Sequence, residues 1–278
     1  MIQWKLIQIK SSVICGSLSS KVRCIIAFHT LVNYGGQGEY KMCTSIISNK
    51  KKTIIGWNLD ILDMDHKVVA EDDKVYIAIN DETEGWLPLF GANARGDFVA
   101  MPTCWPFDDR SNPVNEDCHN IITLDIDLLL GKKTLNEIKA IVEREPVYSV
   151  PGVTFQSQLS DKDGNVLRII PGQGYQYFSK PEYAVLTNFS PFKGDTEQHP
   201  WMGWDRYNKA AEMLENKKDD LNVSDCFAIL KATAQTVCPT VVSMVFDASD
   251  NMVYWCEDQE WDRVQKKKLL YLSTVYLS

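Results

Sequence analysis

The chain has 278 residues, of which 45% are hydrophobic and 24% are charged. This composition is typical of a globular protein with a full core and excludes a disordered or disulfide-stapled chain. The formal net charge is −8, and a nucleic-acid partner is not expected without a basic stripe. The two dense basic runs, Lys50–Lys52 and Lys266–Lys268, are interpreted as a hairpin tip and a frayed end on solvated surface.

The eight cysteines form no pair with C-x-x-C spacing, and none lies near a histidine at zinc-finger spacing. We therefore expect neither a zinc site nor a disulfide framework, but buried, reduced cysteines in a cytoplasmic protein. No apolar stretch is long enough to span a bilayer, and polar residues such as Gln3 and Gln8 interrupt any signal-peptide core. No metal or organic cofactor is implied.

Residues 1–42 differ from the rest of the chain, because they lack clear periodicity and end in the glycine-rich stretch 35–38. From Cys43 onward the pattern is regular. Two β-type runs, 44–48 and 53–60, flank the polar turn 49–52 and predict a β-hairpin. Because a hairpin folds its ends together, we expect Cys43 and Asp60 to be neighbours, although a cysteine on a strand is most often a core residue.

Later elements follow in chain order. Further β-type runs predict strands at 68–70, 75–79 and 97–101. Apolar residues on one face and a capping box of Thr134 and Glu137 predict a helix at 134–145. Strands are then predicted at 154–159, 166–170, 175–178 and 183–187, with a hairpin turn at 161–165 between the first two.

The last third of the chain returns from helices to strands. Helices are predicted at 204–216 and at 224–235, the second capped by Ser224. A closing hairpin is predicted from the runs 240–246 and 252–255. Antiparallel strands, then helices, then strands again favour an α+β layered structure, and the lack of a linker favours a single domain over 43–278.

Five stretches of sequence resemble the choloylglycine hydrolase superfamily, which includes bile salt hydrolases, penicillin V acylases and acid ceramidase. Members begin with Cys-Thr and carry a Gly-Arg-Asn-φ-Asp strand at the distance seen here. The matching stretches are Cys43–Ile47, Gly56–Asp60, Ala92–Phe98, Val185–Asn188 and Asp205–Tyr207. They appear in the family's order and cover about residues 43–260.

The resemblance implies an N-terminal-nucleophile (Ntn) hydrolase with a four-layer αββα sandwich of antiparallel sheets. Such an enzyme hydrolyses a linear, non-peptide C–N amide bond through a thioester acyl-enzyme. Cys43 would be the nucleophile, and its own α-amine, which titrates near about 7.7–8.0, would be the base. By resemblance, Asp60 would hold the amine, Asn188 would donate to the oxyanion, and Arg206 would favour the thiolate.

Two positions depart from the family pattern. Trp57 replaces the family arginine next to Asn-φ-Asp, and Thr103 stands where the family often has asparagine. We expect Trp57, Thr103 and Trp105 to contact substrate, with other aromatic residues near the site. The aromatic residues in question are Trp57, Trp105, Phe107, Phe189, Phe192, Trp201 and Trp204.

The mechanism needs a free amine on Cys43, and two routes supply one. Residues 1–42 are a propeptide that the protein removes itself, or translation starts at Met42 and loss of Met42 exposes Cys43. The second route is preferred, because 35–39 would be encoded by a guanine-rich stretch that resembles a bacterial ribosome-binding site.

Several alternatives stay open. The departure at Trp57 favours a catalytically weakened Ntn-fold binding protein as the second interpretation, and a papain-like thiol hydrolase using His119 or His199 is the third. The residues do not distinguish bile salts, N-acyl amines, penicillin V and N-acyl homoserine lactones as substrate. The resemblance implies a small-molecule amide partner and a homotetramer.

Overall fold

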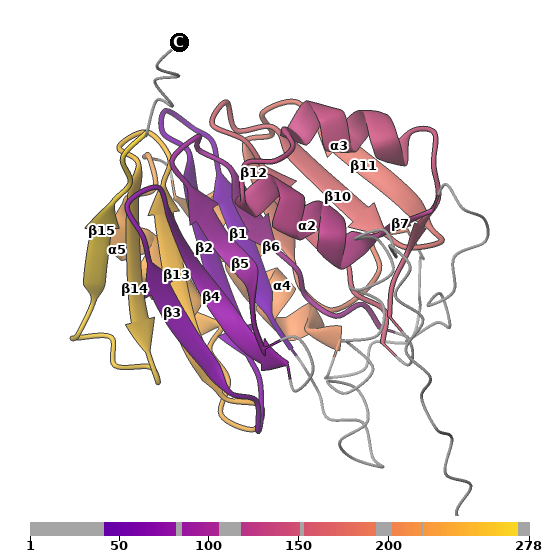
Figure 1. Ribbon diagram of the computed structural model, residues 1–278. Helices are drawn as coiled ribbons and strands as arrows, with labels where there is room; N and C mark the ends of the chain where they lie inside the picture. Colours follow the sequence, from indigo (N-terminus) through magenta and orange to yellow (C-terminus); the bar gives the residue numbers. More distant parts are fainter. Residues whose placement is uncertain are drawn as a thin grey trace, which may run out of the picture.

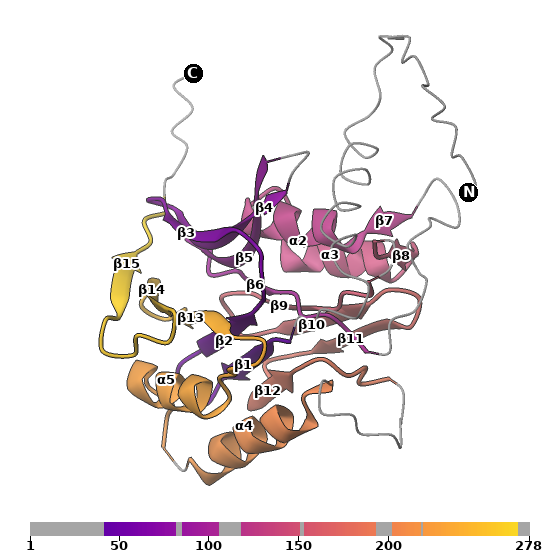
Figure 2. The ribbon, with the colours of Figure 1, turned by 90° about the horizontal axis from the view of Figure 1, so that it is seen from below.

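Two antiparallel sheets lie face to face, and helices cover the outer face of each (Figures 1 and 2). The computed structural model describes residues 42–81, 85–105, 118–150, 153–192, 202–217 and 219–271. The predicted α+β, four-layer αββα sandwich is therefore confirmed. Phe107, His199, Trp201 and residues 1–41 lie outside the described residues.

The first sheet carries the predicted hairpin in its middle. Its strand order is β12 (Tyr183–Leu186), β1 (Thr44–Ser48), β2 (Ile54–Asp60), β13 (Thr240–Asp247), β14 (Met252–Glu257) and β15 (Gln265–Lys268). Every residue of β1, β2 and β13 is buried, because the second sheet covers one face and helices cover the other. This explains why apolar residues stand at adjacent positions in these strands, as at Ile46–Ile47, Ile54–Ile55 and Val241–Val242, rather than at alternate positions.

The second sheet has the order β11 (Gly174–Phe178), β10 (Val166–Ile170), β9 (Ser157–Ser160), β6 (Phe98–Ala100), β5 (Gly85–Asn93), β4 (Lys74–Asp81) and β3 (His66–Ala70). A separate parallel pair joins β7 (His119–Asn120) to β8 (Val147–Tyr148). The predicted strands of this sheet are confirmed, whereas β5 was not predicted from the sequence.

The described residues form two helical layers. Helices α2 (Ile121–Leu129) and α3 (Leu135–Val142) pack on the second sheet, and α4 (Trp204–Asn216) and α5 (Val223–Ala232) pack on the first (Figure 2). The predicted capping box of α3 is present. The prediction for α5 was wrong at its start, because Asn222 rather than Ser224 is the N-cap, in a capping box with Asp225.

Two further elements differ from expectation. Helix α2 was not predicted, and its N-cap is Asn120, whose side chain accepts from the Ile122 N–H. Lys266–Lys268 form strand β15 at the edge of the first sheet rather than a frayed end. Lysines on an edge strand discourage pairing with another chain, so the basic run is compatible with a strand at this position.

Gly56 sets the spacing between the first sheet and α5. A Cβ at this position would lie 2.7 Å from Cys226 Sγ and 2.8 Å from Ile46 Cγ1, in a layer that is already close-packed. We expect Gly56→Ala to lower the free energy of unfolding by about 1–3 kcal/mol through overpacking. Urea denaturation followed by circular dichroism measures the change.

Gly85→Ala is the control for this substitution. Gly85 has a φ of 74°, but a Cβ there meets no atom within 4 Å, so only the backbone penalty of about 1 kcal/mol applies. A smaller loss for Gly56→Ala than for Gly85→Ala would contradict the packing argument.

Candidate active site

Cys43 lies directly before β1, at the end of the hairpin, and is only 3% exposed. The antiparallel register pairs Thr44 with Asn58, so Cys43 lies next to Leu59 and Asp60 at the end of β2. The predicted proximity of Cys43 and Asp60 follows from this register. Met42, the residue before the cysteine, is also buried, so the Met42–Cys43 peptide bond lies inside the site.

Arg206, in the first turn of α4, contacts the three other residues that the resemblance singled out. Its Nη1 donates to the carbonyl oxygen of Cys43 at 2.6 Å and to Thr44 Oγ1 at 2.9 Å. Its Nη2 donates to Asn188 Oδ1 at 2.8 Å, and Nη1 lies 3.9 Å from Asp60 Oδ2. The guanidinium is buried, so these contacts replace the water that it loses.

A glycine makes room for this guanidinium. Gly203, the N-cap of α4, has a φ of 75°, in the left-handed region that favours glycine. A Cβ at this position would lie 2.3 Å from Arg206 Nη2. The turn before α4 and the placement of Arg206 are therefore coupled.

Asn188, just after β12, presents its side-chain oxygen Oδ1 to Cys43. The backbone N–H of Cys43 donates to Asn188 Oδ1 at 3.0 Å, and Asn188 Nδ2 donates to the Thr103 carbonyl oxygen at 3.0 Å. A backbone carbonyl only accepts, and Arg206 only donates, so the amide orientation is determined by its neighbours. The side-chain N–H of Asn188 thus faces Thr103, and its Oδ1 accepts from the Cys43 nitrogen. The resemblance had implied that Asp60 would hold this nitrogen.

Asp60 is bound by two residues that the sequence did not single out. Thr240 Oγ1 donates to one carboxylate oxygen at 2.6 Å, and Gln235 Nε2 donates to the other at 2.5 Å. Burial raises the pKa of Asp60 to about 7, while Arg206, Thr240 and Gln235 act to lower it. Gln235 lies beyond α5 and Thr240 begins β13, and neither belongs to a motif that pointed to the site.

The Cys43 thiol is held in its neutral form. Its pKa is raised well above the usual range, first by burial and then by the charge of Asp60. A backbone hydrogen bond from Asp60 and the charge of Arg206 act in the opposite direction. Arg206 therefore lowers the pKa of the Cys43 thiol, as expected, but burial raises this pKa by more while Cys43 is inside an intact peptide chain.

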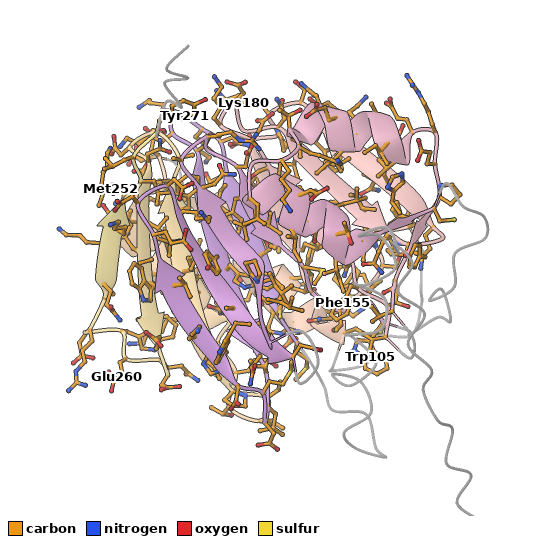
Figure 3. All side chains as sticks on the ribbon, in the orientation of Figure 1. Trp105, Phe155, Lys180, Met252, Glu260 and Tyr271 are labelled. Atoms are coloured by element: carbon orange, nitrogen blue, oxygen red, sulfur yellow. The ribbon has the colours of Figure 1, made fainter. Side chains whose placement is uncertain are left out.

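A narrow apolar cavity opens beside Cys43 between the two sheets. It has a volume of 30 Å³ and is lined by Cys43, Leu59, Ile61, Met64, Ile79, Leu89, Phe90, Met101, Thr103 and Phe155. Phe155 lies at the lower end of the sandwich as drawn in Figure 3, with Trp105 at the same end. Among the described residues that line it, only Thr103 and the thiol are polar, as expected for a site that receives an apolar group.

The two predicted aromatic contacts are placed differently. Trp57 is fully buried in the core between the sheets and does not line the cavity. Its ring is tilted by 33° against that of Phe90, with ring centroids 5.5 Å apart. Trp105 is half-buried, and its backbone N–H donates to the Asn188 carbonyl oxygen at 2.6 Å. Of the three predicted substrate contacts, the structure brings only Thr103 to the cavity wall.

His119, in β7, contacts Glu145 rather than Cys43. The described residues contain no group of three or more His, Cys, Asp or Glu side chains arranged to hold a metal ion. Within the same residues, no helix has the length and apolar character needed to cross a membrane.

The raised pKa of Asp60 predicts a pH dependence of stability. The folded state binds a proton at about pH 7, and the unfolded carboxyl at its ordinary value of 3.8, so the folded state holds more protons between these values. The free energy of unfolding therefore falls by roughly 3–5 kcal/mol as pH rises from about 4 to 7, and it levels off above pH 7. We expect Asp60→Asn to remove this part of the slope.

Urea denaturation of the intact chain and of the Asp60→Asn variant at several pH values tests this. Asp125 is a second buried carboxyl with a raised pKa, but it is present in both proteins and cancels in the difference. Parallel stability curves for the two proteins would show that Asp60 is already ionised at pH 5.

The comparisons with known proteins bear on the fold. No protein-family model matches the sequence, and no curated protein matches it. Among solved structures, a cysteine-to-alanine mutant of conjugated bile acid hydrolase from Clostridium perfringens matches with a TM-score of 0.58 at 15% identity, over 81% of this chain and 92% of that one. An arginine-to-leucine variant of the same hydrolase has a TM-score of 0.55 at 15% identity, over 84% and 100%.

Penicillin V acylase from Agrobacterium tumefaciens is similar as well, with a TM-score of 0.51 at 12% identity, over 77% of this chain and 82% of that one. At such low sequence identities these matches show the fold alone. The chain thus has the sandwich fold of conjugated bile acid hydrolase and penicillin V acylase, which is the fold that the sequence resemblance implied.

Proposed function

We propose that this protein is a cysteine amidohydrolase of the N-terminal-nucleophile type, related to the choloylglycine hydrolase superfamily, that cleaves a linear, non-peptide C–N amide bond. Cys43 is the nucleophile after residues 1–42 have been removed. One observation carries the proposal: the buried groups of Asp60, Asn188 and Arg206 converge on Cys43 at the mouth of an apolar cavity.

The contacts to the Cys43 backbone favour an N-terminal nucleophile over a thiol with a separate base. Asn188 Oδ1 holds the Cys43 nitrogen, and Arg206 holds the carbonyl oxygen of the same residue. A papain-like site would need an imidazole beside the thiol, whereas His119 is engaged by Glu145. Precise positioning of a backbone nitrogen serves catalysis when that nitrogen is a free amine.

The reaction follows from these positions. The α-amine of Cys43 takes the thiol proton, and the sulfur attacks the amide carbonyl carbon. When the tetrahedral intermediate collapses, the C–N bond breaks and the ammonium returns the proton to the leaving amine. A water molecule, deprotonated by the same amine, then attacks the thioester and releases the carboxylic acid and the free thiol.

The positive charge of the new terminus also changes the thiol. In the intact chain, burial and Asp60 keep the thiol neutral, and removal of the preceding peptide places an ammonium group within the same residue. An adjacent positive charge lowers the pKa of a cysteine, and Asp60 gains an oppositely charged partner. For Asn188 to stabilise the oxyanion, its Nδ2 has to exchange Thr103 for the substrate oxygen.

A binding protein with the same fold is the second candidate. The neutral, buried thiol favours it, as does the apolar Trp57 at the position where the resembling family carries a charged arginine. This candidate predicts a ligand in the cavity without turnover and without a requirement for Cys43.

Intact-mass analysis of protein expressed from the full gene, followed by an amide hydrolysis screen, tests the proposal. We expect a chain that begins at Cys43 and hydrolyses N-acyl amides, and we expect Cys43→Ala to lower kcat to the uncatalysed level, because this variant lacks both the thiol nucleophile and the acyl-enzyme that it forms. Cys256→Ala is the matched control, since this buried cysteine lies on β14 away from the site, and it should keep wild-type kcat.

Two results would overturn the proposal. One is turnover by a chain that retains residues 1–42, since a blocked amine is not a base. The other is wild-type activity in Cys43→Ala with a native circular dichroism spectrum.

A further inference from the structure

The hairpin that carries Cys43 arranges the inner face of the first sheet in layers. On the face turned to the second sheet, Cys43 lies beside Leu59, the next layer pairs Ser45 with Trp57, and the third pairs Ile47 with Ile55. Side chains two residues apart on a strand share a face, and successive layers are about 6.6 Å apart. Trp57 therefore lies one layer deeper in the sandwich than the thiol.

Trp57 fills this second layer completely. Its side chain has no exposed surface, and its strand neighbour on β13 is Met244. Its ring lies 5.5 Å from that of Phe90. Phe90 and Leu59 both line the cavity, and Leu59 lies two residues from Trp57 on the same face of β2. The indole therefore packs against the wall of the cavity through Phe90.

The cavity is small and apolar. Its volume of 30 Å³ contrasts with 580 Å³ for the open depression near Arg95 and Asp163. The described residues that line it have no charged side chain, so a carboxylate, an amine or a sugar placed among them would lose its hydration without compensation. An alkyl group gains about 0.8 kcal/mol for each buried CH₂, which makes an aliphatic acyl chain the matching chemistry.

We propose that Trp57 is a positioning residue that sets the depth of this cavity, so that the site accepts short apolar acyl groups and excludes long acyl chains. The turnover part of this inference rests on the proposed function, and the binding part does not. Trp57 acts by holding Phe90 in place and by occupying the volume into which a longer chain would extend.

The unpaired indole N–H indicates that Trp57 contributes by its size and shape rather than by a hydrogen bond. Trp57 Nε1 is buried and has no hydrogen-bond partner among the described residues, which costs about 1–3 kcal/mol. The side chain thus contributes volume and a ring face rather than a polar contact. Trp57→Phe removes the unpaired donor and keeps a ring against Phe90, so this variant is expected to fold and to keep the preference for short chains.

The experiment compares wild type, Trp57→Phe and Trp57→Leu, each expressed from the full gene. Calorimetry measures the binding of butanoate, hexanoate and dodecanoate, the acids that hydrolysis would release. The kcat/KM for the matching N-acyl amides is measured in parallel. Trp57→Leu is expected to raise the ratio of dodecanoyl to butanoyl kcat/KM by ~10-fold or more, and to gain binding of dodecanoate, while Trp57→Phe stays close to wild type.

Phe246→Leu is the matched control. Phe246 is an equally buried core aromatic on β13 that stacks on Phe98 and does not line the cavity. Its loss should lower stability and leave the chain-length ratio unchanged. A ratio that rises equally in Phe246→Leu would show that general loosening of the core, and not Trp57, is responsible.

The outcomes separate the two proposals. If wild type binds dodecanoate as tightly as Trp57→Leu does, the depth inference is wrong. If wild type hydrolyses no amide but binds butanoate and rejects dodecanoate, while Trp57→Leu binds both, the depth inference stands and the proposed hydrolase activity fails. If Trp57→Leu does not fold, a wild-type protein that binds dodecanoate as tightly as butanoate would overturn the inference.

Discussion

The buried guanidinium of Arg206 is the interaction on which the site depends. It reaches from α4 to the Cys43 carbonyl, the Thr44 hydroxyl and the Asn188 side chain, and so ties a helix to two neighbouring strands of the first sheet. A buried cation is tolerated only when its donors are satisfied. The same contacts that satisfy Arg206 therefore determine where the Cys43 backbone lies, and this requires a glycine at position 203.

Asn188 extends this arrangement from the first sheet to the second. Its oxygen accepts from Cys43 and Arg206, and its amide nitrogen donates to Thr103, which follows β6 and bridges to Phe155. A hydrogen-bonded chain thus runs across the mouth of the cavity, with apolar side chains below it. In the proposed function, the polar chain would position Cys43, and the apolar cavity would receive the group that is placed against it.

Burial acts on the site in two opposite ways. It excludes water from Cys43 and Asp60, which strengthens each contact between them and Arg206. It also disfavours the charged forms of the thiol and the carboxyl, so the pKa of each is raised in the intact chain. A free amino terminus at Cys43 would add a positive charge that lowers the pKa of both groups. Removal of the preceding peptide would therefore change the chemistry of the site.

The sequence alone determined most of the local elements, and it predicted which residues form the candidate site. Its apolar runs and turn residues were sufficient for the central hairpin, for α4 and for most strands, because these depend on short-range periodicity. Motif order brought together Cys43, Asp60, Asn188 and Arg206.

Only the tertiary structure decided that Asn188 Oδ1 faces the Cys43 nitrogen and that Gln235 and Thr240 bind Asp60. It likewise decided that Trp57 is buried against Phe90 and is not among the residues that line the cavity. These features depend on strand register and on contacts between residues more than 100 positions apart, for which a local pattern carries no signal.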